Sequence, residues 1–319
     1  MQVNPDMPPV DDEDMGVMGL TEVDPSPVEN TPAEYKEKSY FPDQERQDGE
    51  TEEMRGIKGM NTLGFRLGDH GTAWWLLRIQ KYSSYTFTAF AALHITNVSI
   101  IPLATRSVLQ SNRYLLLTRP YYQSALTEPL LVGLPLVTHV TSGIALRLWR
   151  RRQALQRYGA ETSTDKRTIP WPALSGTSAL GYALLPLASF HIWTTRILPL
   201  YAHGDSSLIN LNYISHGFAL HPVVSFTGFT AMVGVGVWHF AWGAAKWMGF
   251  APSQVSNSEE NKALVRKRRW YVINGISAAI TGLWLAGGLG VVGRDGTMVG
   301  WVGKEYDELY KYLPMVARW

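Results

Sequence analysis

The sequence contains five long stretches of apolar residues, and none of them has Asp, Glu, Lys or Arg near its middle. At a rise of 1.5 Å per residue, a helix of each length could cross the hydrocarbon core of a bilayer, which is about 30 Å thick. We therefore predict an all-α membrane protein with about five transmembrane helices, rather than a soluble helical bundle. The predicted spans are residues 82–104, 124–149, 176–200, 222–248 and 270–293.

Charge divides the chain into two unlike parts. Residues 1–55 hold 16 acidic and 4 basic side chains, whereas residues 56–319 hold 11 acidic and 25 basic ones. Residues 1–60 also contain seven prolines and few aromatic residues, so this segment cannot bury enough apolar surface to offset the entropy lost on ordering. We predict a disordered acidic tail over 1–60, an interfacial segment over 61–81 and a C-terminal tail over 294–319.

The basic residues predict an orientation. Thirteen Lys and Arg residues lie in the connections between spans two and three and between spans four and five, against four in the opposite loops. Since basic loops remain in the cytosol, the N-terminal tail is expected there and the C-terminal tail on the far side. The acidic N-terminus resembles neither a secretory signal nor a mitochondrial presequence, so we expect targeting by an internal apolar segment. The chain has no cysteine, which excludes disulfides and thiolate metal sites.

The spans repeat one another. The first span reads FAALHITN and then IPL, and the third reads LASFHIWT and then LPL, with their histidines and prolines 97 residues apart. The second and fourth spans each place a glycine four residues after a histidine, 100 residues apart. The sequence therefore predicts a duplicated two-helix unit, 82–149 and 176–248, plus one extra helix, with the two units related by an axis along the membrane normal. The span histidines are His94, His139, His191 and His239.

An ionisable side chain at membrane depth usually faces the bundle interior and has a function. One hypothesis is that paired imidazoles of these four histidines hold the iron of haem b, while Gly143 and Gly243 make room for the flat ring. No other metal site is expected. Counted from the predicted cytosolic ends of the spans, the pair His94 and His191 differs in depth from the other pair by about 6 Å, which suits one haem, or none, better than two.

The alternative hypothesis needs no ligand. The same histidines could form hydrogen bonds between helices and so hold the bundle together. The polar side chains suggested as their partners are Thr96, Asn97, Thr138 and Ser142.

A short motif lies in the acidic tail. The stretch LTEVDPSP begins at Leu20 and places a second apolar residue, Val23, three positions later, followed by Pro25 and Pro27. The prolines favour an extended backbone at low entropic cost, so the segment can lie along the edge of a sheet with its apolar side chains in pockets. Proline-rich tails also produce Pro-x-Pro by chance.

Two resemblances follow from these features. The histidine-bearing span pair is distantly similar to the cytochrome b membrane anchors of succinate dehydrogenase and fumarate reductase. The duplicated unit behind an acidic tail, with the motif at residues 20–27, resembles the fungal mitochondrial outer-membrane adaptor family. That resemblance implies a multi-pass protein of the mitochondrial outer membrane. It also implies that Leu20, Val23, Pro25 and Pro27 bind the bridge-like vacuolar protein sorting lipid-transfer protein.

The favoured function is therefore an adaptor at membrane contact sites that supports mitochondrial lipid homeostasis, not an enzyme. Membrane lipids are expected partners and nucleic acid is not. One alternative is a b-type cytochrome that moves electrons within the membrane. A further alternative is a helical bundle that scrambles lipids between leaflets.

Overall fold

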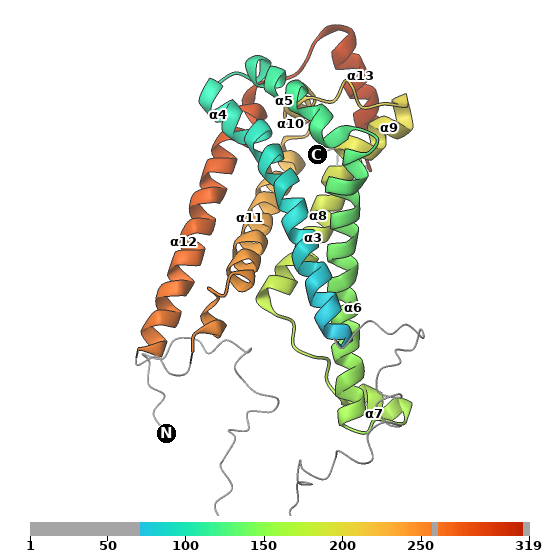
Figure 1. Cartoon of the computed structure of the whole chain (residues 1–319). Coiled ribbons are helices and arrows are strands. Elements are labelled where there is room, and N and C mark those ends of the chain that lie inside the picture. Colours follow the sequence, from blue (N-terminus) through green and yellow to red (C-terminus); the bar gives the residue numbers. More distant parts are fainter. Residues whose placement is uncertain (1–70, 257–260, 315–319) are drawn as a thin grey trace, which may run out of the picture.

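The computed structural model describes residues 71–256 and 261–314, and within these ranges every regular element is helical (Figure 1). This confirms the predicted all-α class. Several long helices are continuous through a short π-helical segment. The elements are α3 (Thr72–Ile95), η2 (Thr96–Ile100), α4 (Ile101–Thr105), α5 (Val108–Gln123), η3 (Pro129–Gly133), α6 (Leu134–Arg157), α7 (Ser163–Thr168), α8 (Gly176–Ile192), η4 (Trp193–Ile197), α9 (Leu198–His203), α10 (Leu211–Leu220), α11 (Pro222–Trp247), η5 (Pro252–Gln254), α12 (Lys262–Gly288), η6 (Val292–Arg294) and α13 (Gly300–Lys311).

Four helical stretches in the described part are long and apolar enough to cross a membrane. They are Thr72–Thr105, Pro129–Arg157, Pro222–Gln254 and Lys262–Arg294. The remaining predicted span forms a continuous helix over α8, η4 and α9, but it is less apolar because it contains His191, Arg196 and several hydroxyl groups. Figure 1 shows this helix standing beside α11 in the same bundle. The expected five long helices are therefore present, and four of them qualify as spans by length and composition.

Several predicted boundaries shift, among them the start of α12, which begins at Lys262, eight residues before the predicted fifth span. Helix α3 begins at Thr72, so residues 72–81, expected in an interfacial segment, belong to the same helix as the first span. Helix α6 continues to Arg157, eight residues beyond the predicted end of the second span. The tail over 1–60 and the C-terminal residues 315–319 lie outside the described residues.

The helices pair as the repeat predicts. Helix α3 packs against α6 and helix α8 packs against α11, so each two-helix unit is a packed hairpin in space. Helix α12 packs against α11 and against η2. At the second contact Gly287 lies so close that an added Cβ would be 2.0 Å from the carbonyl oxygen of Ser99. The glycine therefore lets the extra helix approach the first unit.

A break in helical register also repeats. The π-helices η2 and η4 begin 97 residues apart, and each is followed by a proline, Pro102 or Pro199. At the end of each segment a backbone N–H bonds five residues back, to the carbonyl of Thr96 or Trp193. Proline lacks an N–H and cannot continue the ordinary ladder, which accounts for a register change at the same place in both units.

One end of the bundle is covered by three helices that the sequence analysis assigned to loops and to the C-terminal tail. Figure 1 shows α5, α10 and α13 at this end, which we call the far end. Helices α9, α10 and α13 enclose a buried cluster around Tyr213 and Tyr306. The Tyr213 hydroxyl donates to the carbonyl of Thr194, and burial raises the pKa of Tyr213 to about 12. The phenol therefore remains a neutral donor, and its hydrogen bond links α10 to η4.

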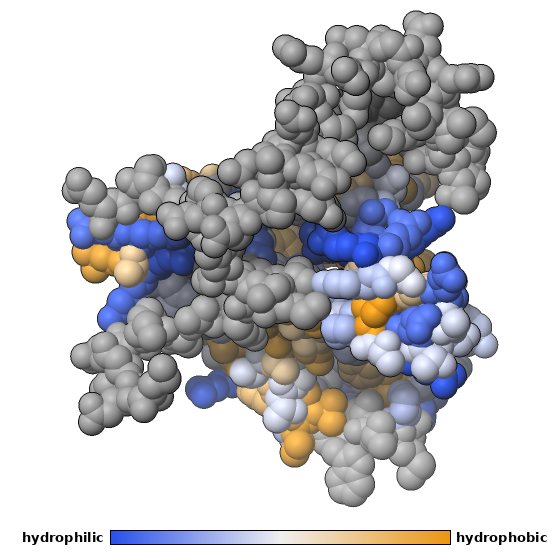
Figure 2. Space-filling view, turned by 90° about the horizontal axis from the view of Figure 1, so that it is seen from below, coloured by the Kyte–Doolittle hydropathy of each residue, from blue (hydrophilic) through white to orange (hydrophobic). Residues whose placement is uncertain are grey.

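The opposite end carries the basic loops. Helix α7 begins with a capping box between Thr162 and Asp165, and the guanidinium of Arg151 donates to carbonyls at and just beyond its end, including that of Ile169. Arginine donors at a helix C-terminus satisfy carbonyls that have no helical partner. Figure 2 looks at this end and shows strongly hydrophilic groups gathered on either side of it.

The orientation remains a prediction that cysteine labelling can test, because the chain contains no cysteine of its own. With the outer-membrane location that the family resemblance implies, we expect Thr164→Cys on α7 to react with a membrane-impermeant maleimide in intact mitochondria. Lys304→Cys on α13 should react once the outer membrane is opened. Both side chains are exposed, so a difference between them reports the side of the membrane. The reverse pattern would place the basic loops away from the cytosol, against the positive-inside rule.

Candidate functional site

Equivalent residues of the two units meet along one line through the bundle. The ring centroids of His94 and His191 are 5.9 Å apart, and those of His139 and His239 are 6.0 Å apart. The paired residues come from different units in both cases, as the predicted axis requires. At the far end the amide nitrogen of Asn112 donates to the amide oxygen of its counterpart Asn212 over 2.5 Å. We call this line the histidine axis.

His139 and His239 form the pair nearer the end with the basic loops, which we call the lower pair; His94 and His191 form the upper pair. The lower pair is held in the same way in both units. The Nδ1 atom of His139 lies 3.1 Å from the carbonyl oxygen of Gln80 on α3. The Nδ1 atom of His239 lies 2.9 Å from the carbonyl oxygen of Thr177 on α8. Gln80 and Thr177 are themselves 97 residues apart, so the repeat extends to these bonds. Since a carbonyl only accepts, each Nδ1 carries the proton and each Nε2 is left with its lone pair.

Gly143 and Gly243 do not have the role proposed for them. A Cβ at Gly143 would lie 2.9 Å from the side-chain amide nitrogen of Gln80. A Cβ at Gly243 would lie 4.0 Å from the side chain of Thr177. Both glycines thus face the partner helix of their own unit, where the absence of a side chain permits close helix packing. They make room for a neighbouring helix and not for a ring on the axis.

The two histidine pairs are much farther apart than the sequence suggested. His139 is level with Gln80, and fourteen residues of α3 separate Gln80 from His94, a rise of about 21 Å. The same spacing separates Thr177 from His191 along α8. The predicted difference of about 6 Å was wrong because it assumed that all spans end at one level. In fact Gln80 lies eight residues into α3, whereas Thr177 lies one residue into α8.

The upper pair, His94 and His191, has no hydrogen bond from either imidazole to a described residue. The His94 ring stacks on Phe90 with the centroids 5.4 Å apart and meets His191 edge to face. The polar side chains proposed as partners instead bond to carbonyls of their own helices. These are Thr96 to Ala92, Asn97 to Leu93, Thr138 to Leu134 and Ser142 to His139. Hydrogen bonding between those side chains and the histidines is therefore not what holds the bundle together.

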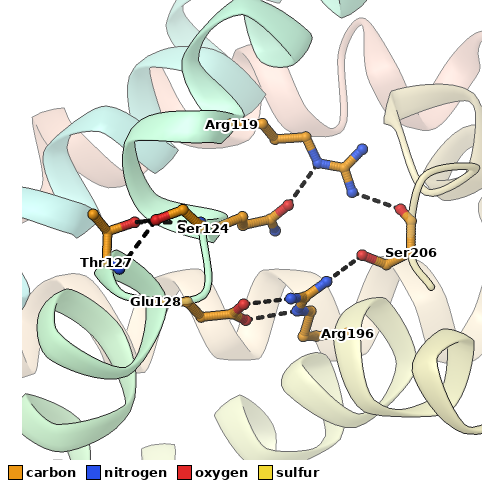
Figure 3. Close-up of polar contacts among 7 residues, drawn as sticks. Arg119, Ser124, Thr127, Glu128, Arg196 and Ser206 are labelled. Carbon is orange, nitrogen blue, oxygen red and sulfur yellow. Dashed lines mark hydrogen bonds and ion pairs between the residues drawn. The ribbon is translucent and has the colours of Figure 1, made fainter. Parts of the chain in front are cut away.

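A charged network joins the two units above the upper pair (Figure 3). The guanidinium of Arg196 in η4 donates through Nε and Nη2 to the two carboxylate oxygens of Glu128, just before η3. It also donates to the hydroxyl of Ser206. Arg119 of α5 reaches the same loop and donates to the carbonyl of Ser206 over 2.7 Å. Burial lowers the pKa of Arg119, while nearby Asp205 and Glu128 oppose that shift.

Sequence reasoning counted Arg119 and Arg196 only as charges of the far-side loops. Their partners, Glu128 and Ser206, lie 68 and 10 residues from Arg196 along the chain, and no local pattern connects them. The sequence did contain an indication of this pair. Glu128 lies at the start of the second span and Arg196 near the end of the third, so two opposite charges lie at the same end of neighbouring spans. A charge so placed is expected to have a partner.

The tail motif cannot be placed. Leu20, Val23, Pro25 and Pro27 all lie outside the described residues. The structure shows where the tail joins the bundle, because Thr72 begins α3 at the end that carries α7 and the basic loops.

The network predicts a specific loss of stability. Glu128→Gln keeps the shape of the side chain but removes its charge, so Arg196 loses its counterion in a site that is about one quarter exposed. We expect the free energy of unfolding to fall by about 1–2 kcal/mol, less than for a fully buried pair because of solvent screening. Thermal unfolding of the purified protein in detergent measures this change. Glu308→Gln, which breaks an exposed pair with Lys311, is the matched control and should have no measurable effect.

Comparison with known protein families gives a match over part of the chain. Residues 186–297 match the family described as MDM10-complementing protein 1, transmembrane domain. No curated protein and no solved structure matches the chain. The matched segment runs from Pro186 in α8 to Thr297 after η6, and so covers most of the second unit and the extra helix. The match supports a relation to a family of mitochondrial membrane adaptors, and with it a mitochondrial membrane location.

Proposed function

We propose that the chain is an adaptor of the mitochondrial outer membrane that presents its N-terminal tail to a bridge-like lipid-transfer protein. The observation that carries this proposal is the motif Leu20, Val23, Pro25 and Pro27, which precedes a membrane domain similar to the MDM10-complementing protein 1 transmembrane domain. The motif alone is weak, because a proline-rich tail contains Pro-x-Pro by chance. Its value comes from the domain that follows it.

The arrangement of the chain suits such a role. The tail joins α3 at the end with the basic loops, which the positive-inside rule assigns to the cytosol. Residues 28–71 connect the motif to the first helix, and a connection of that length can span at most about 150 Å when fully extended. A partner bound to the motif is therefore kept within that distance of the membrane surface.

Recognition would depend on a few anchors. An extended peptide gains affinity from backbone hydrogen bonds to a sheet edge and specificity from alternate side chains in pockets. Leu20 and Val23 supply the apolar anchors, and Pro25 and Pro27 hold the backbone extended before binding, which reduces the entropy lost on association. Such a partner would deliver lipid to the mitochondrion, and the membrane domain would hold it there.

Replacing both prolines tests the proposal. Pro25→Ala with Pro27→Ala should reduce recruitment of the lipid-transfer protein to mitochondria by at least tenfold, because binding energy at interfaces is concentrated in a few residues. The readout is the amount of partner that co-purifies with mitochondria at equal levels of the adaptor. Thr21→Ala with Ser26→Ala changes neighbours of the anchors and should leave recruitment unchanged. Normal recruitment by the proline variant would remove the sequence-specific support for the adaptor role.

A further inference from the structure

We propose that a pocket at the far end binds the headgroup of a phospholipid that carries a primary amine, of the phosphoethanolamine class. The pocket has a volume of about 420 Å³ and lies between α13 and the junction of α10 with α11. This site goes beyond the adaptor role, because the tail that carries the partner motif joins the bundle at the opposite end.

The position of the pocket suits the head of a lipid. His221 lines it, and the next residue, Pro222, begins the membrane-spanning helix α11. The ends of such helices lie at the level of the lipid headgroups. Just inside α11, Val223 is 64% exposed, and Thr227 and Ala231, one and two turns further, are also exposed. The acyl chains of a bound lipid can lie along this strip, where the Thr227 hydroxyl already donates to a carbonyl of its own helix.

The charges of the pocket come from one face of α13. Lys304, Asp307, Glu308 and Lys311 line it, and residues spaced by three, four and seven positions share a helix face. Lys311 pairs with Glu308, whereas Lys304 has no ion-pair partner within the described part of the chain. Lys304 and Asp307 therefore present one positive and one negative charge to the same pocket.

A buried histidine holds Asp307 in place. The Nε2 atom of His216 lies 2.9 Å from Oδ1 of Asp307, and Nδ1 of the same ring accepts from the backbone N–H of Met298 over 3.0 Å. Because Nδ1 is an acceptor, the single ring proton is on Nε2 and the imidazole is neutral. The histidine thus orients the carboxylate without cancelling its charge. The Asp307 side chain is 48% exposed, so the carboxylate is accessible to a cation.

The two charges match a zwitterionic headgroup. Side chains at i and i+3 of a helix have Cβ atoms about 5–6 Å apart, and the phosphate and the amine of such a headgroup are joined by two carbon atoms. Lys304 can pair with the phosphate and Asp307 with the ammonium, both through charge-assisted hydrogen bonds. A phosphoserine headgroup carries an additional carboxylate, which Asp307 and Glu308 would repel.

The aromatic lining of the pocket favours a primary amine over choline. Quaternary ammonium groups are recognised by the open faces of aromatic rings. Tyr310 lines the pocket, but its ring stacks on Tyr213 with the centroids 4.8 Å apart and meets His221 edge to face. Among the described residues the pocket therefore has no aromatic cage. A primary ammonium can instead donate hydrogen bonds to Asp307.

Native mass spectrometry of the full-length protein in detergent tests the site. The protein is titrated with dioleoyl phosphatidylethanolamine and with the phosphatidylcholine and phosphatidylserine that have the same acyl chains. We expect one phosphatidylethanolamine to bind per chain, with an affinity about tenfold higher than that of either other lipid, because only its ammonium forms hydrogen bonds to a carboxylate without added repulsion. Equal affinity for the three lipids would overturn the proposal.

Two variants separate the two charges. Asp307→Asn removes the negative charge but keeps an oxygen that can accept from His216, so the link between α10 and α13 is retained. It should lower the affinity for phosphatidylethanolamine about tenfold and leave phosphatidylcholine binding unchanged. Lys304→Gln should weaken the binding of both lipids, because both carry a phosphate. A preference for phosphatidylethanolamine that persists in Asp307→Asn would contradict the assigned role of this carboxylate.

Matched controls come from charges outside the pocket. Glu305→Gln changes another carboxylate of α13 that does not line the pocket, and Lys166→Gln changes a lysine of α7 at the other end of the bundle. Both should bind the three lipids as the unaltered protein does. Thermal unfolding of each variant identifies any protein that is misfolded.

Free phosphoethanolamine distinguishes a lipid from a soluble ligand. Only the lipid also covers the exposed strip of α11, so free phosphoethanolamine should displace it only at concentrations at least about a hundredfold higher. Displacement at equal concentrations would assign the pocket to a soluble molecule and overturn the lipid proposal. The adaptor role would stand in either case, because recruitment of the partner measures that role.

Discussion

Lipid offers no hydrogen bonds, so a polar side chain inside the bundle must be satisfied by another part of the protein or by a ligand. This constraint organises the centre of the structure. His139 and His239 reach across their own helix pairs to the carbonyls of Gln80 and Thr177. Those bonds fix the register of α6 on α3 and of α11 on α8, and they turn both rings toward the axis between the units. The glycines one turn away permit the close helix contact that these bonds require.

Duplication accounts for the axis but not for the whole fold. Helices α5 and α10 occupy equivalent places, and Asn112 meets Asn212 between them. Yet α10 is buried beneath α13, whereas α5 leaves Leu109 and Leu117 about 70% exposed. The terminal helix α13 therefore gives α10 a cover that α5 lacks. Helix α5 itself lies at the far end of the bundle (Figure 1).

The sequence predicted the fold class, the helix pairing and the residues on the axis, because span length, repeat offsets and intramembrane histidines are all local patterns. The prediction was wrong for the separation of the histidine pairs, because that depends on how far each helix is shifted along its neighbour. Nothing local shows that His139 is level with Gln80, so the separation of the histidine pairs was greatly underestimated. The short helices α10 and α13 were missed for another reason. Their apolar residues are buried against each other at the far end, and neither is long enough to stand out as a span.

A membrane anchor for a peptide motif needs little more than one apolar helix of about 20 residues. This chain instead maintains a duplicated bundle with four histidines on its axis and a charged clamp, Arg196 with Glu128, that holds the two units together. Each intramembrane polar group costs free energy unless it is well paired. An adaptor role explains the tail but gives no reason to keep these groups at two matched depths.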